Sequence, residues 1–308
     1  MTKKTRAILF LLVIILLIYI FNEIKKFDPS NENQSDDIKE FSSSSENKPT
    51  RIPLTIVSAY FDILRGERPK EYYFKRINET AKLNAPFVFF TQAKFKQDIQ
   101  KLFPKNKSLK IITLDLEDLF YYQDIRVIRH IQSLKIYRKK ITAPNRIECV
   151  NPFYIIVQFS KFEFLLKSAQ KNYFNSEKFL WIDAGINRWW GRFNASSKLT
   201  AKAIPNNKFY FTLEKTRLKD KLFIRKDYNI LWKQRSYVLG GVLGGTLEAI
   251  LKVAKKMRKK WRWMLYEQNI VQNEQFALLI EFFENPSLFH FKEVLSAKYF
   301  EQVFNYLK

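Results

Sequence analysis

The chain has 308 residues, of which 46% are hydrophobic, so it can bury a large core and is not disordered as a whole. Its 7 Gly and 10 Pro are fewer turn residues than a β-sandwich or a repeat array needs. The single cysteine, Cys149, excludes an intramolecular disulfide and a metal site built from cysteines.

The formal net charge of +24 is unevenly distributed along the chain. Residues 1–27 carry five Lys/Arg and one Glu (+4), and residues 28–50 carry two Lys and six Asp/Glu (−4), so residues 51–308 hold the whole +24. A domain of this charge attracts anions such as phosphates, acidic glycans and anionic lipids. A lysine-rich solvated surface without a polyanionic partner is the alternative.

The N-terminal segment predicts a membrane anchor. The apolar run from Ala7 to Phe21, extended to Ile24, is just long enough to span a thin bilayer. No small-x-small motif follows it, which favours an uncleaved anchor over a removed signal peptide. We therefore expect a cytoplasmic tail (1–6), a transmembrane signal-anchor (7–24), a flexible acidic, Ser-rich stem (25–50) and one domain (51–308). This single-pass, type II layout places the domain in the Golgi or ER lumen of a eukaryote, or at the inner membrane or cell envelope of a bacterium.

The domain reads as alternating strands and helices. Two segments have the period of helices that bury one face, at 162–169 and 276–283, and a third helix is expected at 246–260. Strands are predicted from five short apolar runs at 54–58, 86–91, 109–114, 178–183 and 208–213. Because helix-length segments separate the strands, the sequence predicts an α/β fold with a mostly parallel sheet covered by helices on both faces. Ligands of such folds bind at the carboxyl ends of the strands.

Asp183 is the first candidate for chemistry because it closes a buried strand. A carboxylate there is expensive to desolvate unless a cation or several N–H donors accompany it. A hard divalent metal that holds a diphosphate would meet that need. Alternatively, Asp183 caps the turn that follows the strand.

Three stretches of the chain resemble the HtrL/YibB-like family, and the order of the elements resembles the wider type A glycosyltransferase fold. They are Leu54–Asp62 (LTIVSAYFD), the Lys161 helix leading into Phe179–Ile186 (FLWIDAGI), and Asn273–Gln275 (NEQ). The similarity runs from about Leu54 to about Phe289, and the Trp-Ile-Asp-Ala-Gly piece is the most specific part. The family is described as glycosyltransferases linked to surface polysaccharide, so the resemblance implies a fold and a reaction class but not a substrate.

The resemblance also implies roles for particular residues. Asp62 would lie near the base and ribose of a nucleotide, whereas the neighbouring Arg65 is as well explained by pairing with Glu67. Lys161 would reach the phosphates, with an ordinary surface lysine as the alternative. Glu274, followed by Gln275, would accept the proton of an acceptor hydroxyl or hold the donor sugar, or else is merely an acid near a helix N-terminus.

The glycine run 240–245 holds four of the seven glycines of the chain. Such clustering indicates a close backbone approach or a positive φ. We expect the N–H groups of Gly240 and Gly241 to face a sugar or phosphate; a packing turn is the alternative.

The chain departs from the wider type A fold at its expected metal site. Those enzymes carry Asp-x-Asp, but here Asp183 is followed by Ala184 and Gly185. We expect a divalent metal, Mn²⁺, on Asp183 with His290 as a distant ligand. The missing acid puts this expectation in doubt, and His290 is also explained as part of an aromatic strand.

Together these features predict a membrane-anchored glycosyltransferase that moves a sugar from a nucleotide-sugar donor to a glycan or glycoconjugate acceptor. Nucleic acid is not an expected partner. One alternative is a non-catalytic, membrane-tethered binder of anionic polymer. Another is a degenerate transferase fold that serves as a scaffold.

Overall fold

The computed structural model describes residues 51–186 and 199–308. The predicted tail, anchor and stem lie outside the described residues. No helix in the two described ranges is both long and apolar enough to cross a membrane.

One sheet organises the described part of the chain. Its seven strands are β1 (Ile52–Tyr60), β2 (Phe87–Thr91), β3 (Leu109–Thr113), β4 (Ser176–Ile182), β5 (Phe209–Glu214), β6 (Val242–Gly245) and β7 (Phe289–Val294). All five strands expected from apolar runs are present, each within two residues of its predicted bounds. The sequence reasoning did not assign β6, and β7 contains the aromatic strand that was the alternative explanation of His290.

The strand order is β3-β2-β1-β4-β6-β5-β7. Strands β3, β2, β1 and β4 are parallel to one another, and β5 is parallel to β7. Strand β6 is antiparallel to both of its neighbours, β4 and β5. The prediction of an α/β fold with a mostly parallel sheet is confirmed. The antiparallel strand β6, between β4 and β5, is an addition.

The two described ranges contain ten α-helices. They are α2 (Lys70–Thr80), α3 (Lys96–Leu102), α4 (Ile125–Ser133), α5 (Lys135–Lys140), α6 (Ile147–Val150), α7 (Pro152–Lys171), α8 (Lys221–Ile224), α9 (Leu247–Arg262), α10 (Glu274–Glu284) and α11 (Tyr299–Leu307). The longest, α7, has clear local signals. The Asn151 side chain caps its N-terminus by accepting from Tyr154 N–H, Pro152 fills the first turn, and Asn172 ends it in the left-handed conformation.

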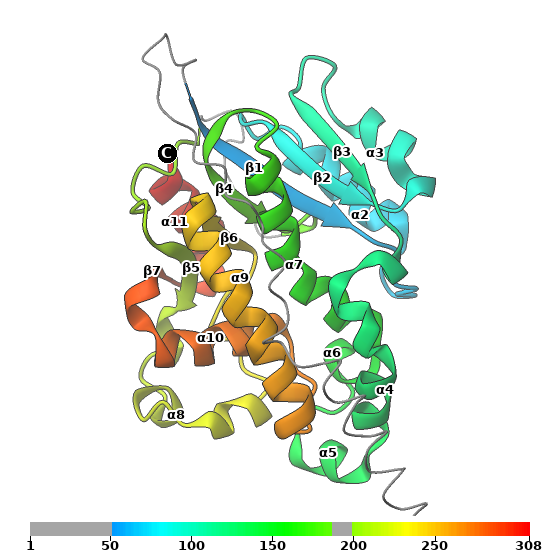
Figure 1. Cartoon of the computed structure of the whole chain (residues 1–308), viewed down its shortest axis with the longest axis vertical. Coiled ribbons are helices and arrows are strands. Elements are labelled where there is room, and N and C mark those ends of the chain that lie inside the picture. The colour runs from blue at the N-terminus through cyan, green and yellow to red at the C-terminus, as the bar shows by residue number, and fades with distance from the viewer. Residues whose placement is uncertain (1–50, 187–198) are drawn as a thin grey trace, which may run out of the picture. The chain divides into compact units, whose positions relative to one another are not determined.

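Helices cover both faces of the sheet. Successive strand residues point to opposite faces, so Val57 belongs to one buried apolar cluster and its neighbour Ile56 to the other. The first cluster includes residues of α7, α9 and α10, and the second includes residues of α2, α3 and α11. Figure 1 shows α7 and α9 crossing one face. This two-sided burial explains why the strands read as nearly continuous apolar runs.

Strand β6 explains two glycines of the 240–245 run. Gly244 has a φ of 149°, and a Cβ on it would lie 2.1 Å from the backbone oxygen of Phe179 in β4. A Cβ on Gly245 would lie 2.8 Å from the backbone oxygen of Lys208. These two glycines are therefore required by the close approach of the chain inside the sheet, and they do not face a ligand. Only Gly240 and Gly241 precede the strand.

Candidate functional site

Asp183 directly follows β4, where the sequence placed it. Its backbone N–H donates to Gly241 O at 3.0 Å, because β6 starts beside the point where β4 ends. Its Oδ1 accepts from Trp181 Nε1 at 2.6 Å, and 35% of the side chain is exposed. Its Oδ2 has no hydrogen-bond partner in the part of the chain that the structure describes. One oxygen is thus held by the protein, and the other is available to a ligand.

Lys161 supplies the cation that this carboxylate needs. It lies in α7 with 2% of its side chain exposed, and its Nζ is 3.1 Å from Asp183 Oδ1 and 2.8 Å from Glu274 Oε1. Nζ also donates to Gly240 O at 3.2 Å. The ammonium thus has two hydrogen bonds, to Glu274 and Gly240, and an ion pair with Asp183. Lys161 is held by the protein in this arrangement, with almost none of its side chain exposed.

The charges of this cluster are strongly coupled. Burial acts to lower the pKa of Lys161, but the carboxylates of Asp183 and Glu274 outweigh it and raise that pKa, so the ammonium stays charged at neutral pH. Burial raises the pKa of Glu274, and Lys161 offsets this only in part. Glu274 Oε2 is buried and has no hydrogen-bond partner among the described residues. The buried acid is therefore held mainly by one ammonium.

Two clefts meet at Asp183. The first, about 180 Å³, lies at the carboxyl ends of β1 and β4 and is lined by residues that include Asp62, Arg65, Arg68 and Lys161. The second, about 400 Å³, is lined by Arg146, Ile186, Ser236, Leu239, Gly240, Gly241, Asn273, Ser296 and Tyr299. Three residues, Tyr154, Asp183 and Gln275, line both. A half-exposed carboxylate thus stands between two separate binding spaces.

Glu274 and its neighbour Gln275 have different positions. Glu274 is fully buried and lines neither cleft, whereas Gln275 lines both. A carboxylate in contact with substrate was expected at Glu274; the structure instead gives it Lys161 as a partner. The reason is that the first residue of α10 turns inward, toward the Lys161 ammonium.

The residues predicted near a nucleotide line the first cleft. Asp62 Oδ1 accepts from Leu64 N–H at 3.1 Å, and its Oδ2 lies 3.5 Å from Lys94 Nζ. Arg65 Nε is 2.5 Å from Glu67 Oε1, the pairing considered as its alternative role. The Cζ atom of the Arg65 guanidinium is 5.9 Å from the centre of the Tyr154 ring. Arg65 therefore stands at the cleft between a carboxylate and an aromatic face.

Gly240 and Gly241 line the second cleft. Both lie in close contact with neighbouring side chains, as the clustering of glycines in the sequence indicated. A Cβ on Gly240 would lie 2.7 Å from Glu274 Oε1, and one on Gly241 would lie 3.1 Å from Ile186 Cδ1. Close packing around the buried Glu274 therefore accounts for Gly240. Contact of these glycines with a ligand stays a prediction.

The cleft residues that the sequence reasoning missed include Arg68, Arg146, Tyr154 and Trp181. Three of them lie in a loop or in the first turn of a helix, where no periodic pattern marks them. Trp181 lies inside the recognised WIDAG piece, yet its indole N–H bond to Asp183 depends on the geometry at the end of β4. Only the three-dimensional arrangement brings these side chains together.

The residues at this site do not fit a divalent metal. The oxygens Asp183 Oδ1 and Glu274 Oε1 both contact the Lys161 ammonium, so a metal on them would face a buried positive charge. His290 lies on β7, where its Nε2 contacts the Tyr306 hydroxyl and burial lowers its pKa, and it lines neither cleft. Within residues 51–186 and 199–308 no three His, Cys, Asp or Glu side chains gather as metal ligands would. The expected Asp183–His290 pair is therefore not assembled.

The family is decided by a comparison of the sequence with family models. A model described as "Bacterial protein of unknown function (HtrL_YibB)" matches residues 53–306. The chain belongs to the HtrL/YibB family. The resemblance drawn from the three sequence stretches is thereby confirmed, over almost the whole described domain. No curated protein matches this HtrL/YibB chain.

Solved structures similar to this HtrL/YibB chain include sugar transferases. One is the galactosyltransferase LgtC in complex with donor and acceptor sugar analogues, at 12% identity and a TM-score of 0.38, over 74% of this chain and 70% of that chain. Another is an active-site mutant of LgtC at 11% identity and a TM-score of 0.39, with the same coverage. Similarity this distant does not indicate what the HtrL/YibB chain binds.

Proposed function

We propose that this HtrL/YibB protein is a glycosyltransferase that moves a sugar from a nucleotide-sugar donor to a glycan or glycoconjugate acceptor. One observation carries the proposal: two clefts share a partly exposed carboxylate, Asp183, which lines both of them. A transfer between two substrates needs two binding spaces with a reactive group at their junction. A protein that only binds a polyanion needs neither.

The first cleft suits the donor. Arg65 and Arg68 line it, and guanidinium groups bind phosphate oxygens through paired N–H donors. They would hold the diphosphate and stabilise the charge that develops as it leaves. Asp62, at the end of β1, would lie on the nucleoside side. Because the residues at Asp183 do not fit a metal, the charge of the leaving group falls to these side chains.

Asp183 would act at the junction as the general base. The acceptor hydroxyl attacks the anomeric carbon, the bond from that carbon to the diphosphate oxygen breaks, and the hydroxyl proton passes to Asp183. Lys161 holds Asp183 in place through an ion pair to Oδ1. Lys161 and Glu274 are thus positioning residues in this scheme, while Gln275 and Tyr154 line the space where the sugar passes.

Nucleotide binding tests the proposal. We expect calorimetric titration of the full-length protein in detergent to show saturable binding of UDP or GDP, and EDTA to leave the affinity unchanged. Heparin, as a probe of general polyanion binding, should compete weakly at physiological salt. Failure of every nucleoside diphosphate to bind, with or without Mn²⁺, would contradict the proposal. Tight heparin binding that nucleotides do not disturb would favour the tethered polyanion binder.

We also propose that residues 7–24 anchor the protein in a membrane, with the domain in the bacterial cell envelope. The support is the apolar run Ala7–Phe21, the lack of a cleavage motif and the bacterial family. The full-length protein should stay in the membrane pellet after extraction with alkaline carbonate. N-terminal sequencing of the purified protein decides between an anchor and a signal peptide. A mature chain that starts after about residue 24 would mean that the segment is removed as a signal peptide.

A further inference from the structure

Arg146 is a cationic side chain of the second cleft that the transfer scheme does not use. Its Nε lies 2.9 Å from Glu148 Oε1, and its Nη1 donates to Gln234 O at 3.3 Å. Its Nη2 donates to no residue in the part of the chain that the structure describes. The side chain is 48% exposed and lines the cleft. Two sides of the guanidinium are thus held by the protein, and the third is left for a ligand.

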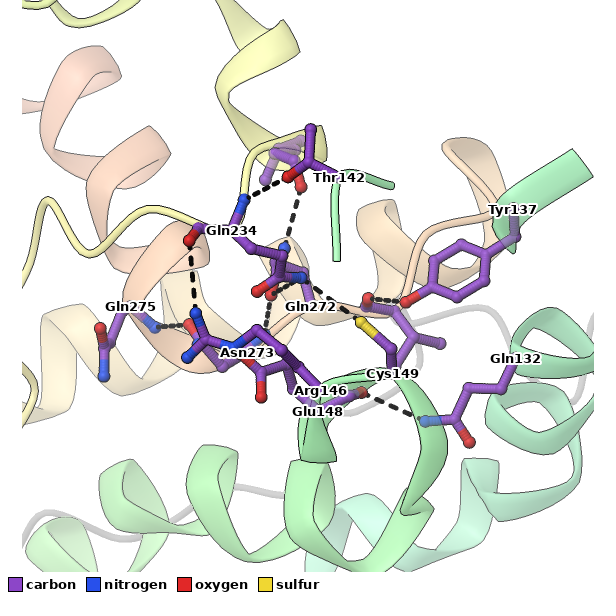
Figure 2. Close-up of polar contacts among 12 residues, drawn as sticks. Gln132, Tyr137, Thr142, Arg146, Glu148, Cys149, Gln234, Gln272, Asn273 and Gln275 are labelled. Carbon is purple, nitrogen blue, oxygen red and sulfur yellow. Dashed lines mark hydrogen bonds and ion pairs between the residues drawn. The ribbon is translucent and has the colours of Figure 1, made fainter. Parts of the chain in front are cut away.

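The groups that hold Arg146 are themselves fixed. The Glu148 side chain is 2% exposed, and its backbone oxygen accepts from Gln132 Nε2 at 3.2 Å. Gln234 donates through its backbone N–H to Thr142 Oγ1 at 2.9 Å, and through Nε2 to Gln272 Oε1 at 3.4 Å. Figure 2 shows these bonds as one network that runs from Gln132 to Asn273 and Gln275. A guanidinium supported in this way keeps its direction without a ligand, which lowers the entropy lost on binding.

The rest of the second cleft is nearly neutral. Among the described residues that line it, Asp183 is the other charged side chain, and its Oδ1 is paired with Lys161. The remaining polar side chains of the lining carry hydroxyls and amides, on Tyr154, Ser236, Asn273, Gln275, Ser296 and Tyr299. Hydroxyls and amides match the hydroxyls of a sugar, while a guanidinium matches a carboxylate or a phosphate.

We propose that the second cleft binds an acceptor sugar that carries an anionic group, and that Arg146 recognises this group. The identity of the ligand as an acceptor rests on the proposed function; the preference for an acidic sugar does not. The acceptor would place a hydroxyl at Asp183 and its carboxylate or phosphate at Arg146. The +24 charge of residues 51–308 favours the approach of such a substrate.

The test compares three probe sugars on the full-length protein in detergent without nucleotide. Glucose, glucuronate and glucose 6-phosphate share a ring, and the two acids differ in the type of anion. Affinities are measured by saturation-transfer NMR. We expect at least one acid to bind about 10-fold or more tightly than glucose, because hydrogen bonds to a charged group are the strong ones. The acid that is preferred identifies the anion as carboxylate or phosphate.

Two variants separate recognition from folding. Arg146→Gln removes the guanidinium but leaves the buried Glu148 without its ion pair, so the protein can lose stability. The double variant Arg146→Gln/Glu148→Gln removes both charges, so no unpaired carboxylate stays buried, and glutamine keeps the size of Glu148. In both variants the affinity for the acid should fall to about the affinity for glucose, while glucose binding persists. The control Arg126→Gln changes an exposed arginine of α4 and should keep the full preference.

An acid preference that survives in the folded double variant would overturn the inference, because the anion would then bind elsewhere on the basic domain. Equal binding of the three sugars, or no binding of either acid at millimolar concentration, would overturn it as well. The nucleotide titration is independent of this result. Loss of nucleotide binding with an Arg146-dependent acid preference would contradict the transferase but not the acidic-sugar site.

Discussion

Asp183→Asn should reduce sugar transfer by about 100-fold or more while nucleotide binding in the first cleft is kept. The amide has the size of the carboxylate and can still accept from Trp181 Nε1, although it loses the ion pair with Lys161. It cannot accept the proton of an acceptor hydroxyl, and removal of a catalytic general base typically costs 10²–10⁴ in rate. Turnover is measured with the UDP- or GDP-sugar whose nucleotide binds, and binding is measured by calorimetry.

The control for this change is Asp115→Asn. Asp115 is exposed and also follows a parallel strand, β3, and asparagine can cap the next turn as aspartate does. It should leave turnover unaltered. Full activity of the Asp183 variant would remove this residue from the reaction, and with it the shared carboxylate on which the two-cleft scheme depends.

Lys161→Met should lower the free energy of unfolding by about 3–5 kcal/mol, because it leaves two carboxyl groups without their buried cation. Urea unfolding of the full-length protein measures the loss. Lys252→Met is the matched control: Lys252 is exposed in α9 and pairs with Glu248 at 2.6 Å, an i,i+4 pair worth only about 0.3–0.5 kcal/mol. Equal, small losses in both variants would contradict the buried charge cluster.

A second change locates the penalty on Glu274. Adding Glu274→Gln to Lys161→Met should recover part of the lost stability, because a neutral amide is cheaper to bury than a carboxylate. The Lys161→Met variant should also become more stable as the pH falls toward the ordinary carboxyl pKa. Burial raises the pKa of Glu274, so the folded state binds the proton more tightly than the unfolded state. Stability therefore decreases as the pH rises from the carboxyl pKa of the unfolded chain to the higher pKa of the folded state.

Much of the fold followed from hydrophobic pattern alone. The strands β1 to β5 and the helices α7, α9 and α10 are strongly periodic or continuously apolar. Strand β6 was not predicted because two of its four residues, Gly244 and Gly245, are glycines, which normally weaken a strand. What selects them is the 2.1 Å clash that a Cβ on Gly244 would make with Phe179 O, a contact between segments far apart in sequence.

The site was predicted in part. Asp183 was placed by a local rule, since a polar residue that ends a buried strand must emerge at the sheet edge. The partnership of Lys161 with Glu274 was not, because nothing local shows that a lysine on α7 points at the first residue of α10. Burial of an ion pair depends on the packing of whole elements, so the sequence supplied the residues but not their roles. Arg146, in a loop before a four-residue helix, gave no signal.

The contact between Lys161 and Glu274 also sets an order of events during protein synthesis. The two residues are 113 positions apart in the chain. At roughly 5–20 residues per second, Glu274 is made about 6–23 s after Lys161. Until then Lys161 in α7 lacks its partner Glu274. For most of this time β4 also lacks its neighbour β6. During this interval the edge of β4 that later pairs with β6 is exposed. A chaperone or the ribosome surface can shield that edge until β6 has been made.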